Sequence, residues 1–212
     1  MNFLLSKYSK IGIALFLVSL DIFLKSDIDK VLQFIKCSRT DDNKLLNIKF
    51  VIMGVDFGYQ KQMYKIINEF DLESHILIIK NPSREDVLGG YAESEFLVLP
   101  SRWELSPLTP LEGFAFKKSV ISTNTHGIPS TIKNDYHGLL VESENSKQLA
   151  KSILELLNNK EKLISFGLAG YKMIVDECNS VKMASNTLNT VSYTHLRAHE
   201  TEADLVCRLL LE

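Results

Sequence analysis

The chain of 212 residues has few of the features that mark specialised protein classes. Its three cysteines show neither metal-ligand spacing nor a disulfide framework, so we expect a cytoplasmic protein. A net charge of −2 leaves no basic excess, which argues against sequence-independent binding of nucleic acid. His75 and His137 have no carboxylate or cysteine at ligand spacing, and we therefore expect no metal site.

Long hydrophobic runs are also scarce. The only one, Ile11–Leu20, is ten residues long and is ended by Asp21. A membrane-spanning helix needs about 20 apolar residues, so this run is too short to cross a bilayer. Lys7 and Lys10 precede it and leave a signal peptide as an alternative, although no small-residue cleavage site follows.

The last residues are unlike the rest of the chain. Val191–Thr201 and Leu205–Glu212 resemble the in-frame translation of a sequencing-library adapter, so we interpret 191–212 as a non-native tail. A natural amphipathic tail is the alternative. Without the tail, which has two arginines and four acidic residues, the remaining chain carries 22 charges of each sign and is the size of one domain.

Strand-like apolar runs alternate with helical patterns, which predicts an α/β fold. We expect a doubly wound, Rossmann-like parallel sheet of about six strands with helices on both faces. The expected strands are Ala14–Val18, Asn47–Met53, Ile76–Ile79, Phe96–Leu99, Val120–Ser122 and Gly138–Val141. The continuous apolar run Ile76–Ile79 is typical of a strand buried on both faces. Ser26–Asp29 and Ser83–Asp86 have the pattern of capping boxes and predict helix starts.

Several polar or glycine-containing loops follow the expected strands directly. Gly54, Lys80-Asn81, Ser101–Glu104 and Thr123–Gly127 each come after a different strand. Because ligands of open α/β sheets bind at the carboxyl ends of the strands, these loops are expected to meet at one crevice.

The most informative segment is Ser101–Glu112. It sets Glu104 and Glu112 eight positions apart, on either side of Ser106-Pro107, where a helix over Pro107–Phe116 is expected to begin. A helix N-terminus favours anions, and carboxylates accept hydrogen bonds from hydroxyls. Taken alone, the acidic pair could equally be two solvated carboxylates near a helix start.

The flanking motifs extend this pattern. After a strand come Pro100-Ser101, Glu104, Ser106-Pro107-Leu108, Glu112 and Ala115, then a strand, Gly127-Ile128-Pro129, and the strand Gly138-Leu139-Leu140-Val141. In this order and spacing, the stretch from about Ile48 to Asn158 resembles the nucleotide-sugar-binding half of a retaining GT-B glycosyltransferase of the group 1 type. On this interpretation 48–190 is the donor-binding Rossmann-like domain, and 1–47 is a poorly matching first strand–helix unit of it.

The resemblance implies a role for each matching residue. Glu104 would be the catalytic-site carboxylate that binds the donor sugar, and Glu112 would bind the ribose hydroxyls. Ser106 and Pro107 would open the helix, so that the backbone N–H groups of Leu108 and Thr109 face the diphosphate. Proline suits the first helical turn because its missing N–H is not needed there.

Other matches are less specific. The resemblance implies that Gly54 begins a loop where the backbone approaches the donor, and that Lys25 neutralises the leaving diphosphate. Asn81-Pro82 would lie in the base-contacting loop, and His126-Gly127 in the glycine-rich turn, where the family commonly has glycine at the histidine position. Each of these residues also has an ordinary explanation as a turn or surface residue.

The resemblance implies transfer of a sugar from a nucleotide-diphosphate sugar, with no cofactor and no metal. The acceptor would be a glycan, a lipid or a small molecule held by a missing N-terminal domain, and the parent protein could bind a membrane peripherally. Two departures stand out: Val18–Asp21 lacks the family's phosphate-pairing arginine, and residues before Ile48 match poorly. The alternatives are a binding module without turnover, a GT-B-type epimerase, and a receiver or flavodoxin-like domain.

Overall fold

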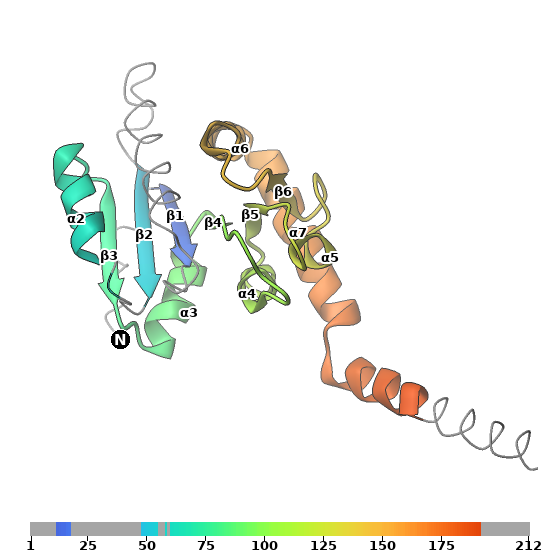
Figure 1. Ribbon diagram of the computed structural model, residues 1–212. Coiled ribbons are helices and arrows are strands. Elements are labelled where there is room, and N and C mark those ends of the chain that lie inside the picture. The colour runs from blue at the N-terminus through green and yellow to red at the C-terminus, as the bar shows by residue number, and fades with distance from the viewer. Residues whose placement is uncertain (1–11, 18–47, 55–57, 59, 192–212) are drawn as a thin grey trace, which may run out of the picture. The chain divides into compact units, whose positions relative to one another are not determined.

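The computed structural model describes residues 12–17, 48–54, 58 and 60–191 (Figure 1). The chain forms two compact units, Met1–Tyr171 and Lys172–Glu212. Lys25, the capping box expected at Ser26–Asp29 and the tail from residue 192 lie outside the described residues.

The first unit is built on a six-stranded sheet in which all neighbouring strands are parallel, in the order β3-β2-β1-β4-β5-β6 (Figure 1). The strands are β1 (Gly12–Leu17), β2 (Ile48–Gly54), β3 (Ile76–Lys80), β4 (Phe96–Leu99), β5 (Ser119–Thr123) and β6 (Gly138–Val141). The strand order reverses between β1 and β4, and such a switch point opens a crevice at the carboxyl ends of the strands. The predicted doubly wound fold is confirmed.

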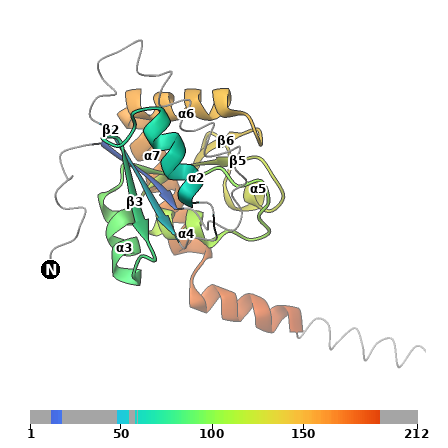
Figure 2. The same cartoon turned by 60° about the vertical axis from the view of Figure 1, so that its left-hand side comes forward.

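Helices follow nearly every strand and lie on both faces of the sheet (Figures 1 and 2). They are α2 (Gln60–Glu69), α3 (Arg84–Glu93), α4 (Leu108–Ala115), the short α5 (Ile128–Thr131), α6 (Ser146–Asn158) and α7 (Lys160–Glu177). Across the described parts of the chain, no helix is both long and apolar enough to cross a membrane.

The hydrophobic core follows the alternation of side chains along each strand. On one face, Phe96 and Val98 of β4 belong to a buried cluster that includes Met63 of α2 and Ile153 of α6. On the opposite face α4 packs closely, since a Cβ at its Gly113 would lie 2.1 Å from a methyl carbon of Leu97. Both faces of the central strands are therefore covered, which explains why β4 and β5 are buried at every position.

The expectation that Ile76–Ile79 would be buried on both faces is wrong. This run forms most of β3, and its residues are only partly buried because β3 is an edge strand. A continuous apolar run does not distinguish an edge strand from a central one, since the distinction depends on which strands pair.

Side-chain caps fix where two helices begin. The Ser83 hydroxyl accepts a hydrogen bond from the backbone N–H of Asp86 (3.1 Å), and the Asp86 carboxylate accepts one from the N–H of Ser83 (2.9 Å). This is the capping box that the sequence predicts, and it lowers the pKa of Asp86. Asn145 caps α6 in the same way, by accepting from the N–H of Gln148 at 3.0 Å.

The second unit contains the end of α7 and a further helical segment over 180–191. The Asn179 side chain precedes this segment and accepts a hydrogen bond from the N–H of Lys182 at 2.9 Å. Val181, Met183 and Leu188 are largely exposed within the unit.

The pairing of β5 with β6 depends on a glycine. A Cβ at Gly138 would lie 1.9 Å from the carbonyl oxygen of Val120 in the neighbouring strand. We expect Gly138→Ala to lower the free energy of unfolding by about 1–3 kcal/mol, because the strand backbones must separate. Urea denaturation measures this, with Lys151→Ala at an exposed position of α6 as the control. Unchanged stability would contradict the close approach of these strands.

Candidate functional site

The acidic segment forms the loop between β4 and α4, at the carboxyl end of a central strand. Helix α4 begins at Leu108, and Pro107 is its N-cap residue with an extended backbone (φ −69°, ψ 126°). The helix thus starts one residue later than the sequence predicts. No side chain of the described residues caps its N-terminus.

The two prolines of α4 determine which backbone donors this helix end offers. The first four N–H positions of a helix have no partner within it. In α4 these positions are Pro107, Leu108, Thr109 and Pro110, and proline has no N–H. The available donors are therefore the N–H groups of Leu108 and Thr109.

This helix end is open to solvent in the first unit. Leu108 is 68% exposed, Leu105 is 67% exposed and Trp103 is 53% exposed. Ser106 is exposed as well. A ligand can therefore reach the N-terminus of α4 without displacing packed side chains.

Glu104 precedes the helix and has few partners of its own. Its Oε1 lies 3.5 Å from the hydroxyl of Ser101, which is a long hydrogen bond. Partial burial raises the pKa of Glu104 above its ordinary value, and the Ser101 contact only partly opposes this. The carboxylate is thus short of hydrogen-bond donors.

Glu112 is held by side chains of the preceding helix. Its Oε1 accepts a hydrogen bond from Arg84 Nη1 at 2.8 Å, and its Oε2 accepts one from the Tyr91 hydroxyl at 2.6 Å. The side chain of Glu112 remains 31% exposed. The sequence reasoning missed Arg84 and Tyr91, although their spacing of seven residues places them on one face of α3.

Hydroxyl groups from the end of β5 hold the acidic loop in place. The Ser122 hydroxyl donates to the carbonyl of Leu99 (2.7 Å), Thr123 to that of Ser101, and Thr125 to that of Arg102 (3.2 Å). The N–H of Gly127 completes the series by donating to the carbonyl of Glu104 at 2.9 Å. These four contacts fasten residues 99–104 to the end of β5 and to the loop that follows it.

The turn at His126-Gly127 has two positions whose geometry favours glycine, although only the second is a glycine in this chain. A Cβ at Gly127 would lie 1.7 Å from the carbonyl oxygen of Leu105, so only glycine fits this crossing of the two loops. His126 has a left-handed backbone (φ 45°), a conformation that favours glycine. Its ring packs against Trp103 with centroids 5.9 Å apart, and its Nδ1 lies 2.7 Å from the Thr125 hydroxyl.

The remaining predicted residues that the structure describes lie at the same end of the sheet. Gly54 is the last residue of β2, and its carbonyl accepts a hydrogen bond from the N–H of Asn81 at 3.0 Å. Asn81 has a left-handed backbone (φ 45°), as asparagine tolerates in turns, and Pro82 follows it. The structure therefore joins Gly54 to Asn81, and joins His126-Gly127 to the acidic loop.

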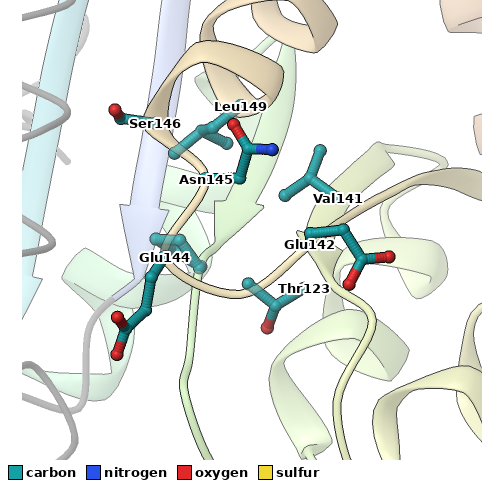
Figure 3. Close-up of a pocket in the computed structure, with 8 residues that line it drawn as sticks. Thr123, Val141, Glu142, Glu144, Asn145, Ser146 and Leu149 are labelled. Atoms are coloured by element: carbon teal, nitrogen blue, oxygen red, sulfur yellow. The ribbon is translucent and has the colours of Figure 1, made fainter.

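A small cavity of about 20 Å³ borders the acidic loop near the start of α6 (Figure 3). Its lining includes Thr123, Glu142, Glu144 and Asn145. The carboxylates of Glu142 and Glu144 point in different directions (Figure 3), and Glu144 pairs with Arg102 of the acidic loop at 3.1 Å. A cavity of this size has room for a water molecule and not for a sugar.

Metal-ligating residues do not gather in this site. Within the described ranges, no three or more histidine, cysteine, aspartate or glutamate side chains are placed to hold a metal ion.

Comparisons with known proteins identify the family. Residues 14–173 match the family described as glycosyl transferases group 1. The chain belongs to this family. This match begins at residue 14, whereas the resemblance found from the motifs begins only at about Ile48.

The chain is also similar to individual members. An uncharacterized glycosyltransferase of Methanocaldococcus jannaschii is 35% identical over 117 residues, which make up 52% of this chain and 33% of that protein. The chain spans about a third of the length of the curated relatives it matches.

Solved structures of glycosyltransferases share the fold. The C-terminal domain of a glycosyl transferase group 1 family protein from Francisella tularensis has a TM-score of 0.66 at 21% identity, over 81% of this chain and 87% of that one. Anabaena HepE in complex with UDP has a TM-score of 0.75 at 13% identity, over 89% of this chain and 50% of that one. The group 1 chain thus has the fold of a C-terminal GT-B glycosyltransferase domain.

The bond from Thr123 to the acidic loop is buried and can be tested. Thr123 is 3% exposed and Ser101 is 2% exposed. We expect Thr123→Val to lower the free energy of unfolding by about 1–3 kcal/mol, because the buried Ser101 carbonyl loses this donor. Thr123→Ser keeps the donor and loses one methyl group, worth about 0.8 kcal/mol. Urea denaturation measures both variants. A larger loss of stability in Thr123→Ser than in Thr123→Val would contradict the hydrogen bond from Thr123 to Ser101.

The raised pKa of Glu104 predicts a pH-dependent cost to folding. Because burial raises its folded pKa, the ionised carboxylate destabilises the fold above that pKa, and the cost disappears below the unfolded value of about 4.3. Glu104→Gln should therefore raise the melting temperature slightly at pH 7, with no rise at pH 4. Thermal melts of the ligand-free chain measure this, with Glu142→Gln as an exposed control. An equal rise at both pH values would refute this explanation.

Proposed function

We propose that this chain is the donor-binding domain of a retaining glycosyltransferase, and that it binds a nucleotide-diphosphate sugar at the N-terminus of α4. One observation carries the proposal. The two backbone donors left by Pro107 and Pro110 lie at an exposed helix end, between two carboxylates held in different ways. Backbone N–H groups and the helix dipole suit a diphosphate, and carboxylates suit hydroxyls.

The roles follow from the position of each group. The N–H groups of Leu108 and Thr109 bind the diphosphate, with Ser106 beside them, and Glu112 accepts hydrogen bonds from the ribose. Glu104 lies before the helix and, within the described residues, accepts only a long hydrogen bond from Ser101, so it is proposed to accept hydrogen bonds from the sugar. Asn81-Pro82 contacts the base.

Three further positions complete the proposed site. Gly54 lets the backbone approach the donor, and His126-Gly127 borders the sugar through its crossing with the acidic loop. Lys25, outside the described residues, is the proposed cation beside the diphosphate.

The proposed reaction is a substitution at the anomeric carbon. The bond from this carbon to the diphosphate oxygen breaks, with the electron pair leaving on the nucleoside diphosphate. A bond to the oxygen of an acceptor hydroxyl forms on the same face of the sugar, and the proton of that hydroxyl passes to the leaving diphosphate. Negative charge grows on the leaving group as the sugar becomes oxocarbenium-like, and fixed N–H dipoles at α4 stabilise that charge. Glu104 and Glu112 do not act as the acid and nucleophile of a glycosidase.

The isolated chain is proposed to bind the donor without transferring the sugar. It spans about a third of its curated relatives, and the GT-B active site lies between two domains. The acceptor, a glycan, a lipid or a small molecule, would be bound by the part of the protein outside this chain. Because its cysteines form no disulfide pattern, we propose a cytoplasmic location.

Titration calorimetry with UDP, GDP and their sugar conjugates tests the proposal. We expect Glu112→Ala to weaken binding of the nucleoside diphosphate roughly 10- to 100-fold, as for a lost hydrogen bond to a charged group. Glu104→Gln should weaken binding of the nucleotide sugar and leave that of the free diphosphate unchanged. The Glu142→Gln variant serves as the matched control.

Three outcomes would contradict parts of this proposal. No binding of any nucleotide by the unmodified chain would reject the donor site. Unchanged binding in Glu112→Ala would remove the role given to that residue. Sugar transfer by the chain alone would reject the statement that it binds without turnover.

A further inference from the structure

The carboxylate of Glu112 has a separate donor on each oxygen, and both donors come from α3. Arg84 Nη1 donates to Oε1 at 2.8 Å, and the Tyr91 hydroxyl donates to Oε2 at 2.6 Å. Arg84 and Tyr91 are seven residues apart, which is two helical turns, so both side chains project from the same face of α3. The capping box at Ser83, the residue before Arg84, fixes where that helix begins.

The two donors differ in how firmly they are held. Tyr91 is fully buried, and its ring stacks on Phe116 with centroids 5.6 Å apart. Burial, together with the hydrogen bond to Glu112, raises the pKa of Tyr91, so the hydroxyl keeps its proton and remains a donor. The side chain of Arg84 is 63% exposed. Tyr91 is thus a buried, fixed hydrogen-bond donor to the Glu112 carboxylate, whereas Arg84 is a donor exposed to solvent.

Counting acceptor sites shows what remains for a ligand. An ionised carboxylate has about four lone-pair sites, two on each oxygen. Among the residues that the structure describes, Tyr91 and Arg84 occupy one site on each oxygen, which leaves one acceptor site on each oxygen of a side chain that is still 31% exposed. Two acceptor sites on neighbouring oxygens match two neighbouring hydroxyls, as on a ribose.

We propose that Tyr91 is a positioning residue that orients the Glu112 carboxylate toward the 2′- and 3′-hydroxyls of the donor's ribose, with Arg84 as a second support. This inference rests on the proposed nucleotide-sugar site. It adds a structural cause for a preference of that site for ribonucleotides over nucleotides that lack the 2′- and 3′-hydroxyls. The role is indirect, because Tyr91 is buried and acts through Glu112. Its removal should therefore affect only the part of the binding energy that comes from the ribose hydroxyls.

The test compares a ribonucleotide with its 2′,3′-dideoxy analogue. The unmodified chain is titrated with UDP, GDP and ADP, and the tightest of these is then compared with its dideoxy form. Tyr91→Phe keeps the buried ring and removes only the hydroxyl. We expect it to weaken ribonucleotide binding about tenfold, as for one hydrogen bond to a charged group, and to leave dideoxynucleotide binding unchanged.

Two further variants make the result specific. Tyr136→Phe removes a hydroxyl from a half-exposed tyrosine just before β6, at the opposite end of the strands, and should change neither affinity. The double variant Tyr91→Phe, Glu112→Gln should bind the ribonucleotide about as well as Glu112→Gln alone, because Tyr91 acts through Glu112. Should Tyr91→Phe fail to fold, Arg84→Gln at its exposed position gives the same comparison, with a smaller ribose-dependent loss.

The outcomes separate this inference from the proposed function. Equal losses for the ribonucleotide and the dideoxynucleotide in Tyr91→Phe and Arg84→Gln would overturn the inference and leave the donor site standing. Equal affinity of the unmodified chain for the ribonucleotide and the dideoxynucleotide would also overturn the inference and leave the donor site standing. Failure of the unmodified chain to bind any nucleoside diphosphate would overturn the proposed function and this inference with it.

Discussion

The hydrogen bonds between the loops after β4 and β5 are the constraint on which the candidate site depends. Strand ends alone fix where a loop starts, but not where its side chains lie. Here Ser122, Thr123 and Thr125 donate to the carbonyls of Leu99, Ser101 and Arg102, and the N–H of Gly127 donates to the carbonyl of Glu104 itself. Because Ser122 and Thr123 belong to a buried strand, and Thr125 and Gly127 to the loop that directly follows it, the acidic loop takes its position from this end of the sheet.

The same constraint positions the start of α4. The acidic loop leads directly into Pro107, so fixing the loop also fixes the helix end that offers the N–H groups of Leu108 and Thr109. Prolines at the first and last of the four unpaired N–H positions concentrate the available donors on these two neighbouring residues. The group 1 chain thus presents a small, rigid pair of donors, where an ordinary helix end would present four.

The sequence predicts much of this arrangement, because local patterns determine it. The strand Phe96–Leu99, the capping box at Ser83 and the order of the motifs from Pro100 to Val141 all depend on residues close together in the chain. The burial of β3 and the partners of Glu112 could not be predicted in this way. Both depend on which elements become neighbours in space, as Arg84 and Glu112 do across 28 positions.

The two acids of the site are prepared for binding by opposite means. Glu112 is already supported by Tyr91 and Arg84, so a ligand finds its carboxylate oriented and spends little energy on ordering it. Glu104 is partly desolvated with only a long contact to Ser101, and a raised pKa reflects that shortage of donors. Hydroxyls of a bound sugar would supply the missing donors, so binding would relieve a cost that the free protein carries. In the proposed roles, recognition of the nucleotide and recognition of the sugar fall to different residues, and each carboxylate has the surroundings that its role requires.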